Sequence, residues 1–344
     1  MNVIKKYKTY AFLALVAVSC TVAVLIYYFF FFHPHSQYSA STFAWSSDGR
    51  IIYYISLQNN NNQLRYFNRQ ALFSRGDNEI KLQEALAPTA ITTSSGNNAL
   101  VTGVVSYSKN TWANLLDTKK NQLSSINLKW SPRLYAFSSE GTQIAYTTDV
   151  SSRRSNINLF STKTMSVTQE LLLQKSVPTI TGLWWTENDG QLYIASQPNP
   201  NEFFQDLYIF DLQTKELTLL LSSKDEYLYF APHGDKILCA SPNGIGVYNR
   251  QTNNQAIVFD ELKDAYTGVC SLADANTIVC QMANFTANKR TFTKINLQSL
   301  KKTVLTEIPI KRQELVRLTF SPSPKGDRLA YLDEQNIIRL IPIK

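Results

Sequence analysis

The stretch FSPSPKGDRLAYLD, residues 320–333, decides the fold because its form recurs along the chain. It joins a strand with an aromatic residue, a short polar turn that contains glycine, and a second, apolar strand. Clear copies are FAWSSDGRIIYYIS (43–56), YAFSSEGTQIAYTT (135–148), LWWTENDGQLYIAS (183–196) and YFAPHGDKILCAS (229–241). Weaker copies are ITTSSGNNALVTGVV (91–105) and VCSLADANTIVCQM (269–282). Repetition on this scale indicates an architecture built from one supersecondary unit.

The spacing of the copies points to one architecture. Their turns lie at positions 49, 96, 141, 190, 234, 275 and 326, and are therefore 41 to 51 residues apart. Each interval also holds a third strand, a turn and a fourth strand, as in DLYIFDLQTKELTLLL (206–221). Four strands in such an interval are typical of a propeller blade. We predict an all-β β-propeller over residues 42–344, with seven four-stranded blades favoured and six as the alternative.

Local patterns agree with this prediction. The turns contain Asp-Gly, Glu-Gly and Pro-x-Gly sequences, whose glycine supplies the positive φ that a tight hairpin requires. In the strand LYIA, residues 192–195, alternation predicts that Leu192 and Ile194 face the core and that Tyr193 and Ala195 face the other side.

These units resemble the WD40-like repeats of TolB-type propellers and of the propellers attached to prolyl-oligopeptidase-type enzymes. The matching residues are the turns Trp45–Gly49 and Phe137–Gly141 and the fuller motif that begins at Phe320. The resemblance implies the fold and says little about function, because many propellers share this short motif. TolB-type propellers have six blades and follow a separate α/β domain, whereas this chain has seven turns, and its repeats begin within about ten residues of the uncharged run Tyr10–Phe32.

The last blade is short of residues. Only 18 residues follow Gly326, which is enough for two more strands but not for three. We predict that the segment 33–41 supplies the missing fourth strand, since ring closure removes an exposed sheet edge. An incomplete last blade is the alternative, in which 33–41 is a short linker.

The first forty residues predict a membrane anchor. Tyr10–Phe32 is a run of 23 residues without a charge, and a helix of this length reaches about 35 Å, which exceeds a hydrocarbon core of about 30 Å. Three lysines precede the run, and the next charged residue is Asp48. Because positive charge stays cytoplasmic, we predict a cytoplasmic tail (1–9), a transmembrane helix (10–32) and an extracytoplasmic propeller, in the bacterial periplasm or at the cell surface.

Other interpretations of this segment fit less well. A cleaved signal peptide has a shorter apolar region and a small-x-small cleavage site, which is lacking near Tyr38-Ser39-Ala40. A lipoprotein signal ending at Cys20 would leave a very apolar mature start. A buried core helix would not explain why the flanking charge lies on one side.

The charge distribution does not indicate nucleic-acid binding. The chain has 34 basic and 26 acidic residues, for a net charge of +8. Lys5, Lys6 and Lys8 belong to the tail, and the remaining excess is scattered, with no basic run longer than two. Phosphate backbones are bound by clustered basic residues, so we predict no nucleic-acid partner.

We identify no catalytic, cofactor or metal site in the sequence. The sequence therefore favours a protein that is not an enzyme, without deciding the question. Nucleophilic hydrolysis usually needs a histidine beside the nucleophile, and the chain has only His33, His35 and His233. There is no Gly-x-Ser-x-Gly sequence. His33 and His35 lack companion ligands for a metal, and a polar linker explains them better.

Two residue pairs each have two alternative roles. Cys270 and Cys280 flank one predicted hairpin symmetrically, so they can form a disulfide in an oxidising compartment or pack as small core residues. Cys239 has the position of Cys280 in its own unit, which favours a core role. Trp184 and Trp185 can both pack in the core, or one ring can act as a binding aromatic near the channel mouth.

We therefore predict a binding or scaffolding protein: a membrane-anchored propeller that docks an envelope or membrane protein partner. Two alternatives remain. One is a receptor for a small ligand or a polymer such as a carbohydrate, and the other is an enzyme with a site in the propeller channel. The sequence does not define the partner or the oligomeric state.

Overall fold

The computed structural model describes most of the chain from Ala40 to Ile343. The gaps within this range are 59–60, 69–77, 83–85, 95, 106–110, 127, 129–131, 152–153, 172, 174–176, 178, 200, 243, 260–266, 275, 285, 311–318 and 334. The predicted membrane helix at 10–32 lies outside the described residues. Within the described ranges, no helix is both long and apolar enough to cross a bilayer.

The first four sheets are four-stranded antiparallel meanders. Sheet one contains β1 (Ala40–Trp45), β2 (Ile51–Gln58), β3 (Asn61–Asn68) and β4 (Asn78–Ile80). Sheet two contains β5 (Leu86–Thr93), β6 (Asn98–Val105), β7 (Thr111–Asp117) and β8 (Gln122–Ile126). Sheet three contains β9 (Pro132–Phe137), β10 (Gln143–Ser151), β11 (Arg154–Ser161) and β12 (Ser166–Leu171). Sheet four contains β13 (Thr179–Trp185), β14 (Gln191–Gln197), β15 (Asp206–Asp211) and β16 (Leu217–Leu221).

The last three sheets continue the pattern, after the short 3-10 helix η1 (Ser223–Asp225). Sheet five contains β17 (Tyr229–His233), β18 (Lys236–Ser241), β19 (Gly244–Asn249) and β20 (Asn254–Phe259). Sheet six contains β21 (Thr267–Asp274), β22 (Thr277–Asn284), β23 (Lys289–Asn296) and β24 (Lys302–Pro309). Sheet seven contains three strands among the described residues, β25 (Phe320–Pro322), β26 (Arg328–Leu332) and β27 (Ile338–Pro342).

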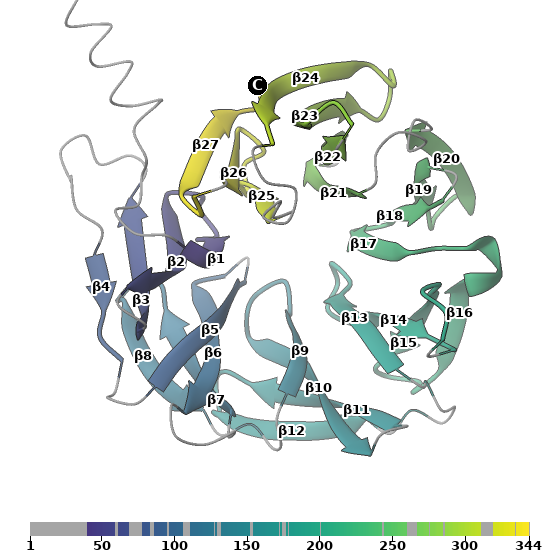
Figure 1. Cartoon of the computed structure of the whole chain (residues 1–344). Helices are drawn as coiled ribbons and strands as arrows, with labels where there is room; N and C mark the ends of the chain where they lie inside the picture. The colour runs from purple at the N-terminus through teal and green to yellow at the C-terminus, as the bar shows by residue number, and fades with distance from the viewer. Residues whose placement is uncertain are drawn as a thin grey trace, which may run out of the picture.

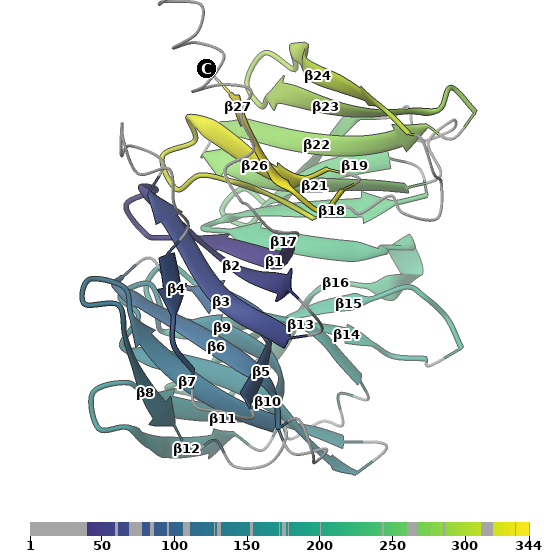
Figure 2. The same ribbon diagram turned by 60° about the vertical axis from the view of Figure 1, so that its left-hand side comes forward.

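The seven sheets surround a common axis, and the first strand of each sheet lies innermost (Figure 1). A view from the side shows the sheets as successive blades of one ring (Figure 2). The prediction of a seven-bladed propeller is therefore confirmed, and the two weaker repeats correspond to β5–β6 and β21–β22.

The hydrophobic core is divided into seven clusters, one between each pair of adjacent blades. In β14, Leu192 and Ile194 pack towards blade three, whereas Tyr193 and Ala195 pack towards blade five. The predicted alternation is correct, but both faces of the strand are buried. A blade lies between two neighbours, so both faces of this inner strand are covered, as expected for sheets packed face to face around an axis.

A buried hydroxyl group organises the turn between the first two strands of five blades. The Ser138 Oγ accepts a hydrogen bond from the Gln143 N–H at 3.0 Å, and the Ser138 N–H donates to the Gln143 carbonyl at 3.0 Å. The same arrangement occurs at Ser46, Ser94, Thr186 and Ser323. These five side chains are at most 5% exposed. The hydroxyl therefore satisfies a backbone group that the turn would otherwise leave unpaired.

Glycine provides the positive φ in most of these turns. Gly49, Gly141, Gly234 and Gly326 have φ between 59° and 70°. In blade four the prediction is wrong in detail, because Asp189 rather than Gly190 has the positive φ, at 54°. The two turns have the same length, and Asp189 has the turn position that Gly49 has in blade one, three residues after the turn hydroxyl. Asp tolerates this conformation better than most residues.

The ring closes where blade seven meets blade one. Phe43 and Trp45 of blade one share a buried cluster with Leu332 and Ile338 of blade seven. The Trp45 Nε1–H donates to the carbonyl of Ser321 at 3.0 Å. Ala40, predicted to belong to a linker or closing strand, is instead the first residue of β1 and pairs within blade one. Residues 33–39 of the predicted closing segment lie outside the described residues.

Candidate functional site

The antiparallel order gives the ring two different faces. Because neighbouring strands alternate in direction, the turns after first and third strands lie on one face, which we call the turn face. The turns after second strands and the links between blades lie on the other face, the connection face. The Ala40 N–H donates to the Asn336 carbonyl at 2.7 Å, so β1 begins on the connection face.

A groove of about 410 Å³ lies on the turn face and crosses blades two to five. We call it the turn-face groove. Its walls are the ends of the innermost strands and the turns that follow them, namely Thr92–Ser94, Tyr135–Ser139, Leu183–Glu187 and Pro232–Gly234. The groove therefore combines four copies of the same part of the repeat, and it lies near the axis of the ring.

Trp184 and Trp185 both line this groove and both are half-buried. The Trp185 Nε1–H donates to the Ala136 carbonyl at 2.9 Å, and its ring packs against the core between blades three and four. The Trp184 ring covers Gly182, where an added Cβ would lie 2.0 Å from Cη2. Each ring thus packs against the blade on one side. The role of these rings as binding aromatics stays a prediction.

Tyr135 also lines the groove, and its half-buried ring packs against the core between blades two and three. Burial raises the pKa of Tyr135 to about 12, and a hydrogen bond with Thr102 opposes this increase. The phenol therefore remains protonated at neutral pH and keeps its hydrogen-bonding proton.

Two other ionisable side chains line the groove at its outer edge, Glu187 and His233. Glu187 extends over the next blade, since a Cβ added at Gly234 would lie 2.4 Å from Glu187 Oε1. His233, which was predicted to lie in a hairpin turn, is the last residue of β17 and is exposed. A carboxylate and an imidazole at this edge provide an acceptor and a donor for a polar ligand.

Hydrogen bonds between blades hold the groove in shape. The Asp189 carboxylate accepts hydrogen bonds from the Ser139 N–H at 2.6 Å and from the Ser139 hydroxyl at 2.7 Å. The Tyr193 hydroxyl donates to the Gly234 carbonyl at 3.1 Å. Neighbouring turns are thus fixed relative to each other, which lowers the entropy lost when a ligand binds.

Sequence reasoning identified the tryptophan pair but missed Tyr135 and Glu187. Tyr135 has the repeat position of Leu183, and Glu187 directly follows the turn hydroxyl of Thr186. The repeat itself could have predicted that these residues lie on the same face as the tryptophan pair, because equivalent positions of the blades converge on one face of a propeller. It was not specific, since the same positions in other blades hold unrelated residues.

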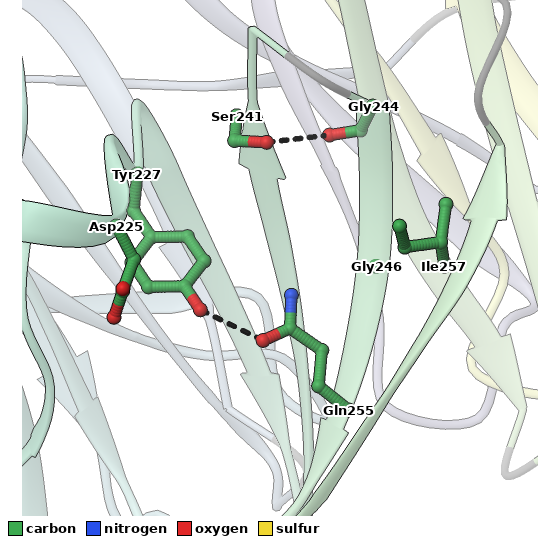
Figure 3. A pocket seen from close by; sticks show the side chains of 7 residues that line it. All are labelled: Asp225, Tyr227, Ser241, Gly244, Gly246, Gln255 and Ile257. Atoms are coloured by element: carbon green, nitrogen blue, oxygen red, sulfur yellow. Dashed lines mark hydrogen bonds between the residues drawn. The ribbon is translucent and has the colours of Figure 1, made fainter.

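A second pocket of about 340 Å³ lies in blade five (Figure 3). The Tyr227 hydroxyl donates to Gln255 Oε1 at 2.7 Å, and burial raises the pKa of Tyr227 to about 12. The amide nitrogen of Gln255 points away from Tyr227 (Figure 3). Ser241 and the exposed Ile257 form other walls. We call this the blade-five pocket.

The cysteines lie apart from both pockets. Cys270 and Cys280 are directly opposite each other on β21 and β22, and their sulfur atoms are 2.04 Å apart as a disulfide. Cys239 is a free cysteine that is 1% exposed, and burial raises its pKa to about 12. Cys239 and Cys280 both face the preceding blade, in agreement with their equivalent positions in the repeat.

No family model matches the sequence, and no curated protein matches it. Solved structures are similar in fold. A prolyl endopeptidase has a TM-score of 0.64 and 13% identity over 85% of this chain, which spans 45% of that protein's length. An oligogalacturonate lyase from Vibrio parahaemolyticus has a TM-score of 0.62 and 10% identity, with coverage of 91% and 92%.

TolB from Acinetobacter baumannii has 16% identity and a TM-score of 0.46, over 64% of this chain and 54% of that protein. The likeness to prolyl endopeptidase agrees with the resemblance drawn from the repeats. At these identities the likenesses to the endopeptidase and the lyase show the fold alone and do not transfer an activity.

Proposed function

We propose that this protein is a membrane-anchored, extracytoplasmic binding module that recognises an extended segment of another envelope or membrane protein in its turn-face groove. The observation that carries the proposal is the composition of this groove. It places Trp184, Trp185 and Tyr135 beside the polar edge formed by Glu187 and His233. Tyr and Trp are enriched among the residues that dominate binding energy at protein interfaces.

The form of the groove favours a peptide-like ligand. Residues from four blades line it, so a ligand that fills it can contact all four. Its hydrogen-bonding groups include the exposed side chains of Glu187 and His233, which can pair with peptide N–H and C=O groups. Because the turns are already fixed by bonds such as Ser139–Asp189, binding does not require them to become ordered.

The membrane anchor rests on the sequence. The uncharged run Tyr10–Phe32, with lysines only on its N-terminal side, supports an orientation with the propeller outside. An impermeant maleimide tests this on intact cells carrying Cys20→Ser with either Gln213→Cys or Lys8→Cys. We expect labelling at position 213 and not at position 8. Labelling only after lysis at both positions would contradict the orientation.

Binding is tested by chemical crosslinking in the native membrane, followed by quantitative mass spectrometry of proteins that co-purify. Trp184→Ala should reduce recovery of the specific partner at least tenfold, since it removes an aromatic wall of the groove. Phe203→Ala is the matched control, because Phe203 is 82% exposed but lies in the segment between β14 and β15, on the connection face. Equal recovery with both variants would exclude the groove as the binding site.

The blade-five pocket favours a second candidate function, a receptor for a small polar ligand. Gln255 Oε1 is engaged by Tyr227, while the amide nitrogen points away from it. An amide donor beside a hydroxyl suits a sugar or a polar amino acid. Thermal-shift measurements with panels of monosaccharides and amino acids test this. A stabilisation that is lost in Gln255→Leu supports the receptor, and no shift with any compound counts against it.

A further inference from the structure

We propose that the turn-face groove binds a lysine or arginine side chain of its protein partner, at the end formed by blades four and five. The inference rests on the proposed function and adds the chemical class of the side chain that is recognised. It is supported by the distribution of charge over the turns, by the position of the Glu187 carboxylate and by the packing of the Trp184 ring.

Charged residues are divided unevenly among the turns that follow the innermost strands. In blades two, three and four these turns lie within 92–98, 135–143 and 183–191, and they contain three carboxylates and no lysine or arginine. The basic residues of the equivalent turns belong to blades one, five and seven, namely Arg50, Lys236, Lys325 and Arg328. Most of the groove therefore lies among turns of negative charge, which favours a cationic ligand.

The two basic side chains in the turns of blade five are engaged outside the groove. Arg250, in the turn after β19, donates to Gln191 Oε1 at 2.8 Å. Lys236 donates to Asn276 Oδ1 at 3.3 Å, in the turn of blade six. Neither Arg250 nor Lys236 lines the groove. A cation bound at this end would thus not share the groove with either of them.

Glu187 provides the negative charge at this end of the groove. Its side chain is exposed and extends over blade five, since a Cβ added at Gly234 would lie 2.4 Å from Glu187 Oε1. Among the residues that the structure describes, none donates a hydrogen bond to this carboxylate or forms an ion pair with it. Asp189 on the same turn differs, because the Ser139 N–H and hydroxyl both donate to its carboxylate. Glu187 is therefore available for a ligand.

Trp184 lies on the same side of blade four as the Glu187 carboxylate. Its ring packs with the cluster between blades four and five, whereas Trp185 packs with the cluster between blades three and four. One side of the Trp184 ring covers Gly182, but the ring is only half-buried and lines the groove. An indole ring attracts a cation placed over its face, and Trp is the best aromatic residue for this contact.

A carboxylate and an indole ring at one end of a groove suit a basic side chain better than a neutral or an acidic one. The basic side chain can form an ion pair and a cation–π contact, whereas an acidic side chain is repelled. A neutral side chain of the same length keeps only the apolar contact. Because both groups are partly exposed, we expect the preference for the charged side chain to be about fivefold to tenfold.

Selection from a phage-displayed library of random peptides tests the ligand class, with the full chain in lipid nanodiscs as the target. Peptides whose binding is lost in Trp184→Ala are those that occupy the groove, and circular dichroism confirms that this variant is folded. We expect lysine or arginine to recur at one position of these peptides. Groove-dependent peptides without a recurrent basic residue would overturn the inference and leave the proposed function intact. If no selected peptide depended on Trp184, both would fail.

A mutant cycle on one selected peptide measures the contact with Glu187. Replacing the recurrent basic residue of the peptide with norleucine should weaken binding to the parent chain about fivefold to tenfold. The same replacement should have a smaller effect on binding to Glu187→Gln, where only the contact with the Trp184 ring is lost.

Glu216→Gln is the matched control for this cycle. Glu216 is an exposed carboxylate in the turn after β15, on the same face as the groove but not among the residues that line it. This variant should retain the full preference for the basic peptide. Equal affinity of the basic and norleucine peptides for the parent chain would overturn the inference, and so would an equal preference in Glu187→Gln and the parent chain.

Discussion

Ser138 illustrates how single residues define a blade. Its hydroxyl is 2% exposed and accepts a hydrogen bond from the Gln143 N–H. Ser138→Ala leaves this buried N–H without its acceptor, so we expect the free energy of unfolding to fall by about 1–3 kcal/mol. Urea denaturation measures the change. Ser124→Ala, at an exposed position of β8, is the control and should change stability by less than about 0.5 kcal/mol.

Asp211 illustrates a second interaction that recurs among the blades, at the turn between the third and fourth strands. Its Oδ1 accepts hydrogen bonds from the N–H groups of Gln213 and Thr214, both at 2.9 Å. The Thr214 N–H, the Gln191 amide and the Gln213 N–H lower the pKa of Asp211 to about 2. Asn249 accepts the equivalent pair of bonds in blade five without a charge.

The lowered pKa of Asp211 predicts a pH dependence. Because the folded value lies below the ordinary value of 3.8, the carboxylate stabilises the fold above pH 3.8, and this contribution is lost as the pH falls towards 2. NMR titration of Asp211 should give a midpoint near 2, and Asp211→Asn should remove the corresponding part of the acid dependence. A midpoint near 3.8 would show that the turn does not hold the carboxylate.

At the scale of the strand pair, the Cys270–Cys280 disulfide joins β21 to β22 across ten residues of sequence. By limiting the unfolded chain, a disulfide of this kind stabilises a protein by about 2–4 kcal/mol. We expect reduction to lower the melting temperature of the parent protein, and Cys270→Ala/Cys280→Ala to melt at the lower temperature with or without reductant. A parent protein that melts identically in both conditions would show that the pair adds no stability.

The strands and turns show how much of the fold could be predicted from the sequence. The repeat of turn and apolar strand predicted a propeller of four-stranded blades and favoured seven of them over six, since the repeat follows from period-2 alternation and glycine turns. The exact position of the positive φ was not predictable in blade four, because Asp189 and Gly190 can both adopt it. The boundary at Ala40 was also missed, because an innermost strand of alternating polarity resembles a linker when its partner is unknown.

The groove was less predictable than the fold. Trp184 and Trp185 were conspicuous as a pair, but Tyr135 and Glu187 come from different turns that only the closed ring brings together. Convergence of this kind depends on blade number and on packing between blades, which single strands do not specify. The blade-five pocket was missed because it depends on the contact between Tyr227 and Gln255.

At the scale of the whole molecule, the contact between blades seven and one holds the ring closed. Trp45 is 3% exposed and donates to the Ser321 carbonyl, and Trp185 makes the equivalent bond to Ala136 between blades three and four. Trp45→Phe should lower the free energy of unfolding by about 1–3 kcal/mol, because it removes the hydrogen bond to Ser321 and reduces a ring that is almost fully buried. Trp185→Phe should cost less, since the Trp185 ring is only half-buried.

Chemical denaturation monitored by circular dichroism compares these two variants. We expect Trp45→Phe to lower the free energy of unfolding more than Trp185→Phe does. The opposite order would contradict the view that the contact between blades seven and one contributes more to stability than the contact between blades three and four. The comparison is balanced, because both substitutions remove an indole N–H and leave an aromatic ring.

The measurement that tests the central claim most directly is site-specific photo-crosslinking in the native membrane. A photoreactive phenylalanine analogue is placed at Trp184 in the full chain, and in a parallel sample at Phe203 on the opposite face. We predict one recurrent protein adduct from position 184, joined through a single short segment of that partner, and no such adduct from position 203. The same adducts from both positions, or none from position 184, would contradict recognition of a protein segment in the turn-face groove.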